Sequence, residues 1–211
     1  MNLASNPARK IPPRWGFCFQ DGRNEGAFCE AIDAALATQP TGKPFVYVEI
    51  GVGHGGALKA VSEYLSQIPG LEYELHGCDV PNYSGHAIDF SVVPENRITL
   101  HLCGAENFWQ QFGKTPDFVF IDACHGKACV MRDFMGAEWL TRMGGVVCFH
   151  DTDPNCQGAH LQPHCGTGID ARAAVEKLGL LHETRHGWRK LNETPGDIGR
   201  GVHGCLFVQR V

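Results

Sequence analysis

Three side chains that could bind a metal ion or move a proton lie at the ends of two predicted buried strands. Asp122 ends the strand 118–122, and His150 and Asp151 end the strand 146–150. The carboxyl ends of neighbouring parallel strands share one edge of a sheet, so we expect the three side chains to converge there. Two carboxylates suit a divalent cation. Alternatively, Asp122 caps the next helix and His150 bonds only to backbone.

A glycine-rich turn precedes these residues in the chain. Gly51, Gly53 and Gly56 form a G-x-G-x-x-G pattern between a buried strand ending at Ile50 and a helix. Glycines let the backbone approach a ligand closely, and the helix N-terminus offers free N–H groups. Asp79 ends the next strand, where a carboxylate can accept ribose hydroxyls. The pattern alone fits a nicotinamide dinucleotide as well as S-adenosylmethionine.

Glu49 favours S-adenosylmethionine over the dinucleotide. It lies two residues before the first glycine of the turn. A buried carboxylate here would repel a pyrophosphate, whereas it suits the cationic methionine end of S-adenosylmethionine. Two further features favour S-adenosylmethionine. The turn lies about 50 residues into the chain, behind a predicted helix, rather than at the chain start. The predicted C-terminal antiparallel pair is not part of a plain doubly wound dinucleotide-binding sheet.

Apolar runs alternate with amphipathic stretches, which predicts an α/β fold with a mostly parallel, doubly wound, Rossmann-like sheet. Two strands at the C-terminus have no helix between them and should pair antiparallel, giving seven strands. The predicted strands are 45–50, 72–79, 97–103, 118–122, 146–150, 181–188 and 202–210, and the predicted helices are 24–38, 57–68, 105–112, 128–143 and 167–178.

We expect one domain, 1–211, with two irregular segments. An N-terminal strap and helix occupy 1–40, and the strap packs on the surface or forms a lid or a dimer contact. A long active-site loop occupies 151–166. Its residues Cys156, His160, His164 and Cys165 either bind zinc or line an acceptor-binding loop.

Composition limits the function classes. The 211 residues carry a formal charge of -5, which gives no basic footprint for nucleic acid. No run approaches the ~20 apolar residues of a membrane helix, and no secretory signal is evident. Ten cysteines, several within predicted strands, suit a reduced cytoplasmic protein. Lys127, Arg132 and Arg142 are expected on solvated faces.

Taken together, four segments resemble the class I S-adenosylmethionine-dependent methyltransferases. They are Val48–Gly56, Asp79, Phe120–His125 and Gly144–Asp151. The closest group is the small O-methyltransferases, whose fourth strand ends in Asp-x-x-His and whose fifth ends in His-Asp or an acidic pair. The resemblance implies the strand order 3-2-1-4-5-7-6.

The resemblance also implies roles for residues at matching positions. Asp79 would hold the ribose, and Asp122 would lie below the sulfonium and the acceptor. The methionine part would be lined by Glu49, Gly51 and Gly53, and the adenine by Gly104 and Ala105.

Metal-dependent members of this group place ligands at the positions of Asp122, His150 and Asp151, with a base at the position of His125. Our hypothesis is that Asp122 and Asp151 bind Mg²⁺ or Mn²⁺. His150 is then a ligand or supports one, and His125 is the general base. Because His150 replaces a carboxylate, Zn²⁺ or Fe²⁺ would also be accepted.

The expected function is O-methylation of a hydroxylated small molecule, a sugar or a vicinal diol that could chelate the cation. We expect no membrane or nucleic-acid partner, and a homodimer is possible. The alternatives are a nicotinamide oxidoreductase and a non-catalytic Rossmann-like binding domain.

Overall fold

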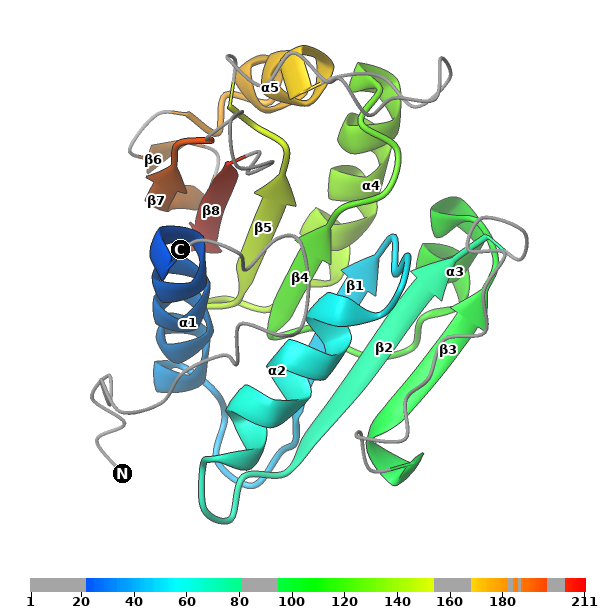
Figure 1. Ribbon diagram of the computed structural model, residues 1–211, viewed down its shortest axis with the longest axis vertical. Coiled ribbons are helices and arrows are strands. Elements are labelled where there is room, and N and C mark those ends of the chain that lie inside the picture. The colour runs from blue at the N-terminus through cyan, green and yellow to red at the C-terminus, as the bar shows by residue number, and fades with distance from the viewer. Residues whose placement is uncertain (1–21, 81–94, 154–167, 182–183, 186, 197–203) are drawn as a thin grey trace.

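A single mixed sheet organises the protein in the computed structural model, which describes residues 22–80, 95–153, 168–181, 184–185, 187–196 and 204–211 (Figure 1). The strands are β1 (Phe45–Ile50), β2 (Tyr73–Asp79), β3 (Ile98–Leu102), β4 (Phe118–Ile121), β5 (Val146–His150), β6 (Thr184–Arg185), β7 (Trp188–Thr194) and β8 (Cys205–Arg210). The helices are α1 (Gly22–Ala37), α2 (Gly56–Ser66), α3 (Ala105–Gln111), α4 (Lys127–Leu140) and α5 (Gly168–Lys177), with a 3₁₀ turn at Glu95–Arg97.

The strand order is β3-β2-β1-β4-β5-β8-β7-β6. The first five strands in this order are parallel, and β8 and β7 run antiparallel to their neighbours. This arrangement confirms the predicted fold class and strand order, with β6 added as a two-residue strand at the edge. The order reverses direction at β1 and β4, and this switch point brings the carboxyl ends of β1, β4 and β5 together.

Alternation along the buried strands builds two cores. On β4, Phe118 and Phe120 pack with α1 and α2, while Val119 and Ile121 pack with α3, α4 and α5. The same alternation holds in β1, so helices cover both faces of the sheet (Figure 1). Strands buried on both faces need apolar residues at every position, which is why the sequence predicted them well.

The C-terminal edge differs from the prediction. Within the strand expected at 181–188 the structure has only the short β6, and the long strand β7 begins at Trp188, the last residue of that prediction, and continues to Thr194 through the segment expected to be a linker. Its sequence is polar because its side chains are mostly half-buried, and its pairing with β8 is interrupted between Lys190 and Asn192. A polar strand of this kind lacks the apolar run that reveals the central strands.

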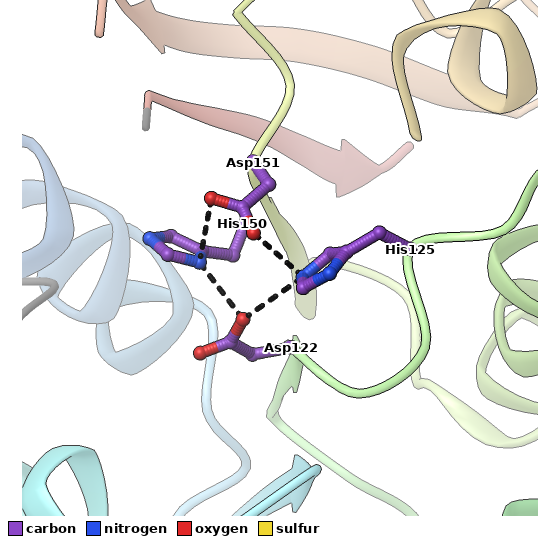
Figure 2. A group of neighbouring side chains, drawn as sticks. All are labelled: Asp122, His125, His150 and Asp151. Atoms are coloured by element: carbon purple, nitrogen blue, oxygen red, sulfur yellow. Dashed lines mark hydrogen bonds and ion pairs between the residues drawn. The ribbon is translucent and has the colours of Figure 1, made fainter. Parts of the chain in front are cut away.

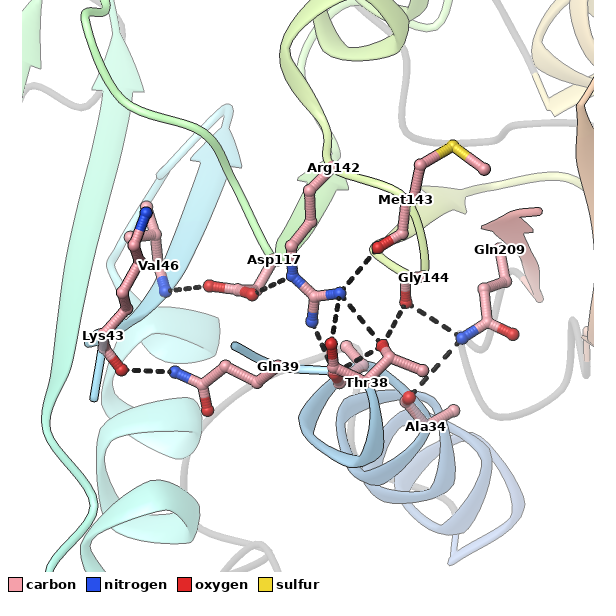
Figure 3. A network of polar contacts seen from close by, with 11 residues as sticks. Ala34, Thr38, Gln39, Lys43, Val46, Asp117, Arg142, Met143, Gly144 and Gln209 are labelled. Carbon is pink, nitrogen blue, oxygen red and sulfur yellow. Dashed lines mark hydrogen bonds and ion pairs between the residues drawn. The ribbon is translucent and has the colours of Figure 1, made fainter. Parts of the chain in front are cut away.

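Arg142 is not a solvated surface residue, contrary to expectation. It lies after α4 and pairs with the buried carboxylate of Asp117, which also accepts a 2.7 Å bond from the backbone N–H of Val46 (Figure 3). The guanidinium also donates to the carbonyl oxygens of Ala35 and Thr38. This group, called the Arg142 network below, joins α1, β1 and β4 at the amino end of the sheet.

The N-terminal strap, the segment 81–94 and most of the loop 151–166 lie outside the described residues, and so do Cys156, His160, His164 and Cys165. No helix in the described ranges is both long enough and apolar enough to cross a membrane.

Candidate active site

Four side chains meet at the carboxyl ends of β4 and β5: Asp122, His125, His150 and Asp151 (Figure 2). Each offers a nitrogen or oxygen atom, and these atoms all lie within 4.8 Å of one another. We call these residues the Asp/His cluster. The structure thus brings together Asp122, His150 and Asp151, the metal ligands expected at the strand ends, and it adds His125 to the same group.

The distances within the Asp/His cluster are short. His150 Nδ1 lies 2.8 Å from Asp122 Oδ1 and 3.3 Å from Asp151 Oδ1. His125 Nε2 lies 2.7 Å from Asp151 Oδ2 and 3.5 Å from Asp122 Oδ1. Each histidine therefore contacts both carboxylates, and the ring of contacts closes in Figure 2.

Strand register and one unusual backbone angle create this geometry. β4 and β5 are parallel, with Ile121 opposite Phe149, so Asp122 and His150 leave the sheet at the same level. Asp151 follows with φ of 56°, the left-handed region that only Gly, Asn and Asp adopt with modest strain. The reversal at Asp151 places its carboxylate next to His125, three residues beyond Asp122.

The residues of the cluster stabilise one another's charged forms, the carboxylates of Asp122 and Asp151 and the protonated imidazole of His125. Burial opposes ionisation of Asp122, but His150 and then His125 hold the pKa of its carboxyl well below the usual range. The pKa of Asp151 is lowered against burial in the same way, chiefly by His150. Burial lowers the pKa of His125, but hydrogen bonding and charge from Asp122 and Asp151 outweigh burial and raise it to about 9. Without a cation, a proton on His125 thus balances part of the negative charge at neutral pH.

The donor set fits a divalent cation. Both ring nitrogens of His125 are buried, and Nε2 lies within ion-pair distance of Asp122 and Asp151 without the alignment of an ideal hydrogen bond. Nε2 of His125 therefore joins the carboxylate oxygens and Nδ1 of His150, which is hydrogen-bonded to Asp122, as a candidate ligand atom for a cation. Two carboxylates with two imidazoles form a mixed oxygen and nitrogen site, which suits Mn²⁺, Fe²⁺ or Zn²⁺ better than an all-oxygen site would.

The glycine turn lies directly beside Asp122. Gly51 has φ of 91°, and a Cβ atom on it would lie 2.3 Å from the backbone oxygen of Asp122. Only glycine fits at such a contact. Gly53 and Gly104 differ, because a Cβ atom on either would meet nothing within 4 Å. The two positions border open space, which is compatible with a bound ligand.

Asp79 fixes the turn in addition to any role toward a ribose. Its Oδ2 atom accepts hydrogen bonds from the backbone N–H groups of Val52 and Gly53, both at 2.9 Å. Its Oδ1 atom accepts a 2.7 Å bond from the N–H of Val80. The sequence identified Asp79 as a ribose partner but did not reveal that it holds the turn. The signal was available, since consecutive N–H groups in a glycine turn attract a carboxylate.

Glu49 is almost fully buried at the end of β1, with 2% of its surface exposed. The hydroxyl of Tyr47 donates a 3.2 Å hydrogen bond to it, a partner that the sequence analysis missed although Tyr47 and Glu49 share one face of the strand. Burial, followed by the charge of Asp122, raises the pKa of Glu49 well above its usual range. A cationic ligand group beside Glu49 would restore its charge.

Comparison with known proteins identifies the family of the segment that carries this site. Residues 48–152 match a family model described as a methyltransferase domain. The chain carries a class I methyltransferase domain. It is of the S-adenosylmethionine-dependent type, which decides between the two cofactors that the glycine turn alone left open. The matched segment of the methyltransferase domain contains the turn and the whole Asp/His cluster.

Solved structures agree with the fold of the methyltransferase domain. An O-methyltransferase from Bacillus cereus in complex with SAH has a TM-score of 0.63 and 16% identity, and covers 97% of this chain and 84% of its own. The O-methyltransferase TomG from Streptomyces achromogenes, involved in tomaymycin synthesis and in complex with SAM, has a TM-score of 0.58 and 17% identity. It covers 86% of this chain and 79% of its own. None of the curated proteins compared matches the chain.

Proposed function

We propose that the methyltransferase domain transfers a methyl group from S-adenosylmethionine to an oxygen of a hydroxylated small molecule, with a divalent cation held by Asp122, His150 and Asp151. The observation that carries this proposal is the convergence of the Asp/His cluster beside the glycine turn. The cluster and Gly51 share the backbone of Asp122, so a methyl donor on the turn would lie next to an acceptor at the cluster. The O-methyltransferase neighbours support the choice of oxygen.

The cofactor side of the site is built from carboxyl groups. Glu49, Asp79 and Asp122 end three adjacent strands, and the charges of Asp122 and Asp79 both act on Glu49. Such a surface attracts the ammonium and sulfonium groups of S-adenosylmethionine and disfavours a pyrophosphate. We assign the methionine part to Glu49, Gly51 and Gly53, the ribose to Asp79, and the adenine to Gly104 and Ala105.

The reaction is a displacement at the methyl carbon. The bond from carbon to sulfur breaks as the bond from carbon to the acceptor oxygen forms, and the hydroxyl proton must leave. A bound divalent cation lowers the pKa of such a hydroxyl and orients it. His125 is the group placed to accept the proton, since its Nε2 atom faces the cluster. Asp122 and Asp151 hold the imidazole in position.

The acceptor class follows from the same donor set. A vicinal diol or a sugar offers two neighbouring oxygens that can complete the coordination of a cation held by Asp122, His150 and Asp151. A neutral acceptor is also favoured, because the cluster and the cofactor side are both rich in carboxylates.

Two measurements test the proposal. S-adenosylhomocysteine should raise the melting temperature and NAD should not, because a ligand that binds only the folded state stabilises it. Methyl transfer to a panel of diols and sugars should stop in EDTA and return with Mn²⁺. A lack of stabilisation by S-adenosylhomocysteine would indicate a non-catalytic domain. Activity that survives full chelation and Asp151→Asn unchanged would remove the cation from the proposal.

Glu49→Gln tests the cofactor side separately. The amide keeps the shape but cannot regain a negative charge, and a hydrogen bond to a charged group contributes about 1.5–3 kcal/mol. We expect the affinity for S-adenosylhomocysteine to fall by roughly 10- to 100-fold, while Mn²⁺ binding changes far less. Unchanged cofactor affinity by calorimetry would exclude Glu49 from the methionine site.

A further inference from the structure

Two thiols lie sulfur to sulfur at the edge of the Asp/His cluster. The Sγ atoms of Cys124 and Cys129 are 2.7 Å apart, and both residues are partly exposed to solvent. A disulfide bond measures about 2.05 Å, so the two sulfur atoms need to move only about 0.65 Å closer to bond. The two residues are reduced in this structure.

The chain between the thiols is short and is bent around them. Cys124 lies in the connection after β4, and Cys129 lies in the first turn of α4. Gly126 precedes α4, and a Cβ atom on it would lie 3.5 Å from the sulfur of Cys124 and 3.8 Å from that of Cys129. Gly126 therefore lies beside both sulfurs, at the point where the connection after β4 turns into α4.

We propose that Cys124 and Cys129 are a site of reversible oxidative modification, at which a hydroperoxide closes an intrachain disulfide. The thiolate of one cysteine attacks a peroxide oxygen, the O–O bond breaks, and a sulfenic acid and water or an alcohol are produced. The second thiol attacks the sulfenic sulfur, the S–S bond forms, and the sulfenic oxygen leaves as water. Two thiols lose two electrons in total and the hydroperoxide gains them.

The position of the pair gives the modification a consequence. Cys124 is bonded directly to His125, whose Nε2 atom lies 2.7 Å from Asp151. A disulfide ties the residue before His125 to α4 and draws the connection after β4 toward the helix. Displacements near 1 Å can cost on the order of 100-fold in rate when a reacting group must be aligned. This effect on methyl transfer rests on the proposed function, whereas formation of the disulfide does not.

Trypsin provides a direct test, because Lys127 lies between the two cysteines. Cleavage after Lys114, Lys127 and Arg132 places Cys124 in the peptide 115–127 and Cys129 in the peptide 128–132. After treatment of the whole protein with hydrogen peroxide and blocking of remaining thiols, mass spectrometry should detect these two peptides linked. Dithiothreitol should separate them. Cys129→Ser should abolish the linked species, and Cys29→Ser, a matched change on α1, should leave it intact.

The activity of the same samples tests the consequence. We expect kcat for methyl transfer to fall by roughly 10- to 100-fold on oxidation and to recover with dithiothreitol, and Cys129→Ser to resist peroxide. Recovery of both peptides unlinked, as thiols or as sulfonic acids, would overturn the site. A linked peptide with unchanged kcat would overturn its effect on His125. If the reduced protein transfers no methyl group, the proposed function fails, and the linked peptide still decides whether the site exists.

Discussion

β4 carries an aspartate at each end, and the two aspartates have opposite surroundings. Asp117, before the strand, accepts hydrogen bonds from Val46 and Arg142 through its two separate oxygens. Asp122, after the strand, faces two histidines, with the second carboxylate of the cluster near by. In the Arg142 network a backbone N–H and a guanidinium neutralise and hold Asp117, while the Asp/His cluster gathers two carboxylates and two imidazoles within 4.8 Å of one another (Figures 2 and 3).

This contrast separates structural charge from functional charge. A buried carboxylate whose partners are backbone N–H and guanidinium groups has nothing left to bind, so its contribution is to the fold. A cluster of two carboxylates and two imidazoles is stable only with an added proton or cation. Substitutions at the two ends of β4 should accordingly affect different measurements.

The largest effect should follow Asp122→Asn. The amide cannot supply the negative charge that the proposed cation and His125 require, so kcat should fall by roughly 10²–10⁴-fold. The measurement is steady-state transfer of labelled methyl groups, with circular dichroism to show that the variant remains folded. Retention of more than a tenth of the activity would remove Asp122 from the chemistry.

Arg142→Met should mainly affect stability. Loss of the guanidinium leaves Asp117 buried without its cationic partner, which costs about 3–5 kcal/mol in the free energy of unfolding. Urea denaturation measures this change, and Arg132→Met on the exposed face of α4 is the matched control. Equal unfolding free energies for the two variants would show that the Arg142 network is not structural.

The stability of the metal-free protein should depend on pH through His125. Its pKa is raised from about 6.5 to about 9, so the stabilisation is fully present below pH 6.5 and is lost as the pH rises through 9. The difference corresponds to at most about 3–4 kcal/mol. Unfolding in EDTA at several pH values measures it, and His125→Gln should flatten the profile. If the unfolding free energy depends on pH equally in the unsubstituted protein and in His125→Gln, another group causes the pH dependence.

The smallest of the expected effects is a rise in Mn²⁺ affinity with each unit of pH. Binding must displace the proton on His125, since the pKa values of both carboxyls are already lowered. Affinity should therefore rise about tenfold per pH unit between 6.5 and 9 and then level off. Calorimetry in buffers of different ionisation enthalpy counts the released protons, and a count of zero at pH 7 would contradict the assignment.

The sequence predicted the parts of the molecule that depend on local pattern. β4 is apolar at every position and β5 is apolar up to His150; Asp122 follows β4 directly and His150 ends β5, so the site could be anticipated from topology. The polar strand β7 and the Arg142 network could not. Arg142 meets Thr38 across 104 residues, and no local pattern distinguishes its side chain from that of a solvated arginine.

The contacts within the site were also only partly visible in the sequence. The resemblance to the O-methyltransferases implied a base at His125 near Asp122, but the approach of Asp151 depends on its left-handed backbone. The contact between Cys124 and Cys129 depends on the turn at Gly126. Backbone reversals of this kind are set by tertiary packing and are therefore hard to predict from residue type.

The absent side chain of Gly51 has a thermodynamic consequence. Because Gly51 lies against the backbone of Asp122, the turn that is expected to hold the cofactor and the carboxylate expected to hold the cation are parts of one rigid wall. Binding of the cofactor and binding of the cation should therefore be energetically coupled. Linkage requires that any factor by which the cation tightens cofactor binding equals the factor by which the cofactor tightens cation binding. The two titrations should therefore give the same coupling energy.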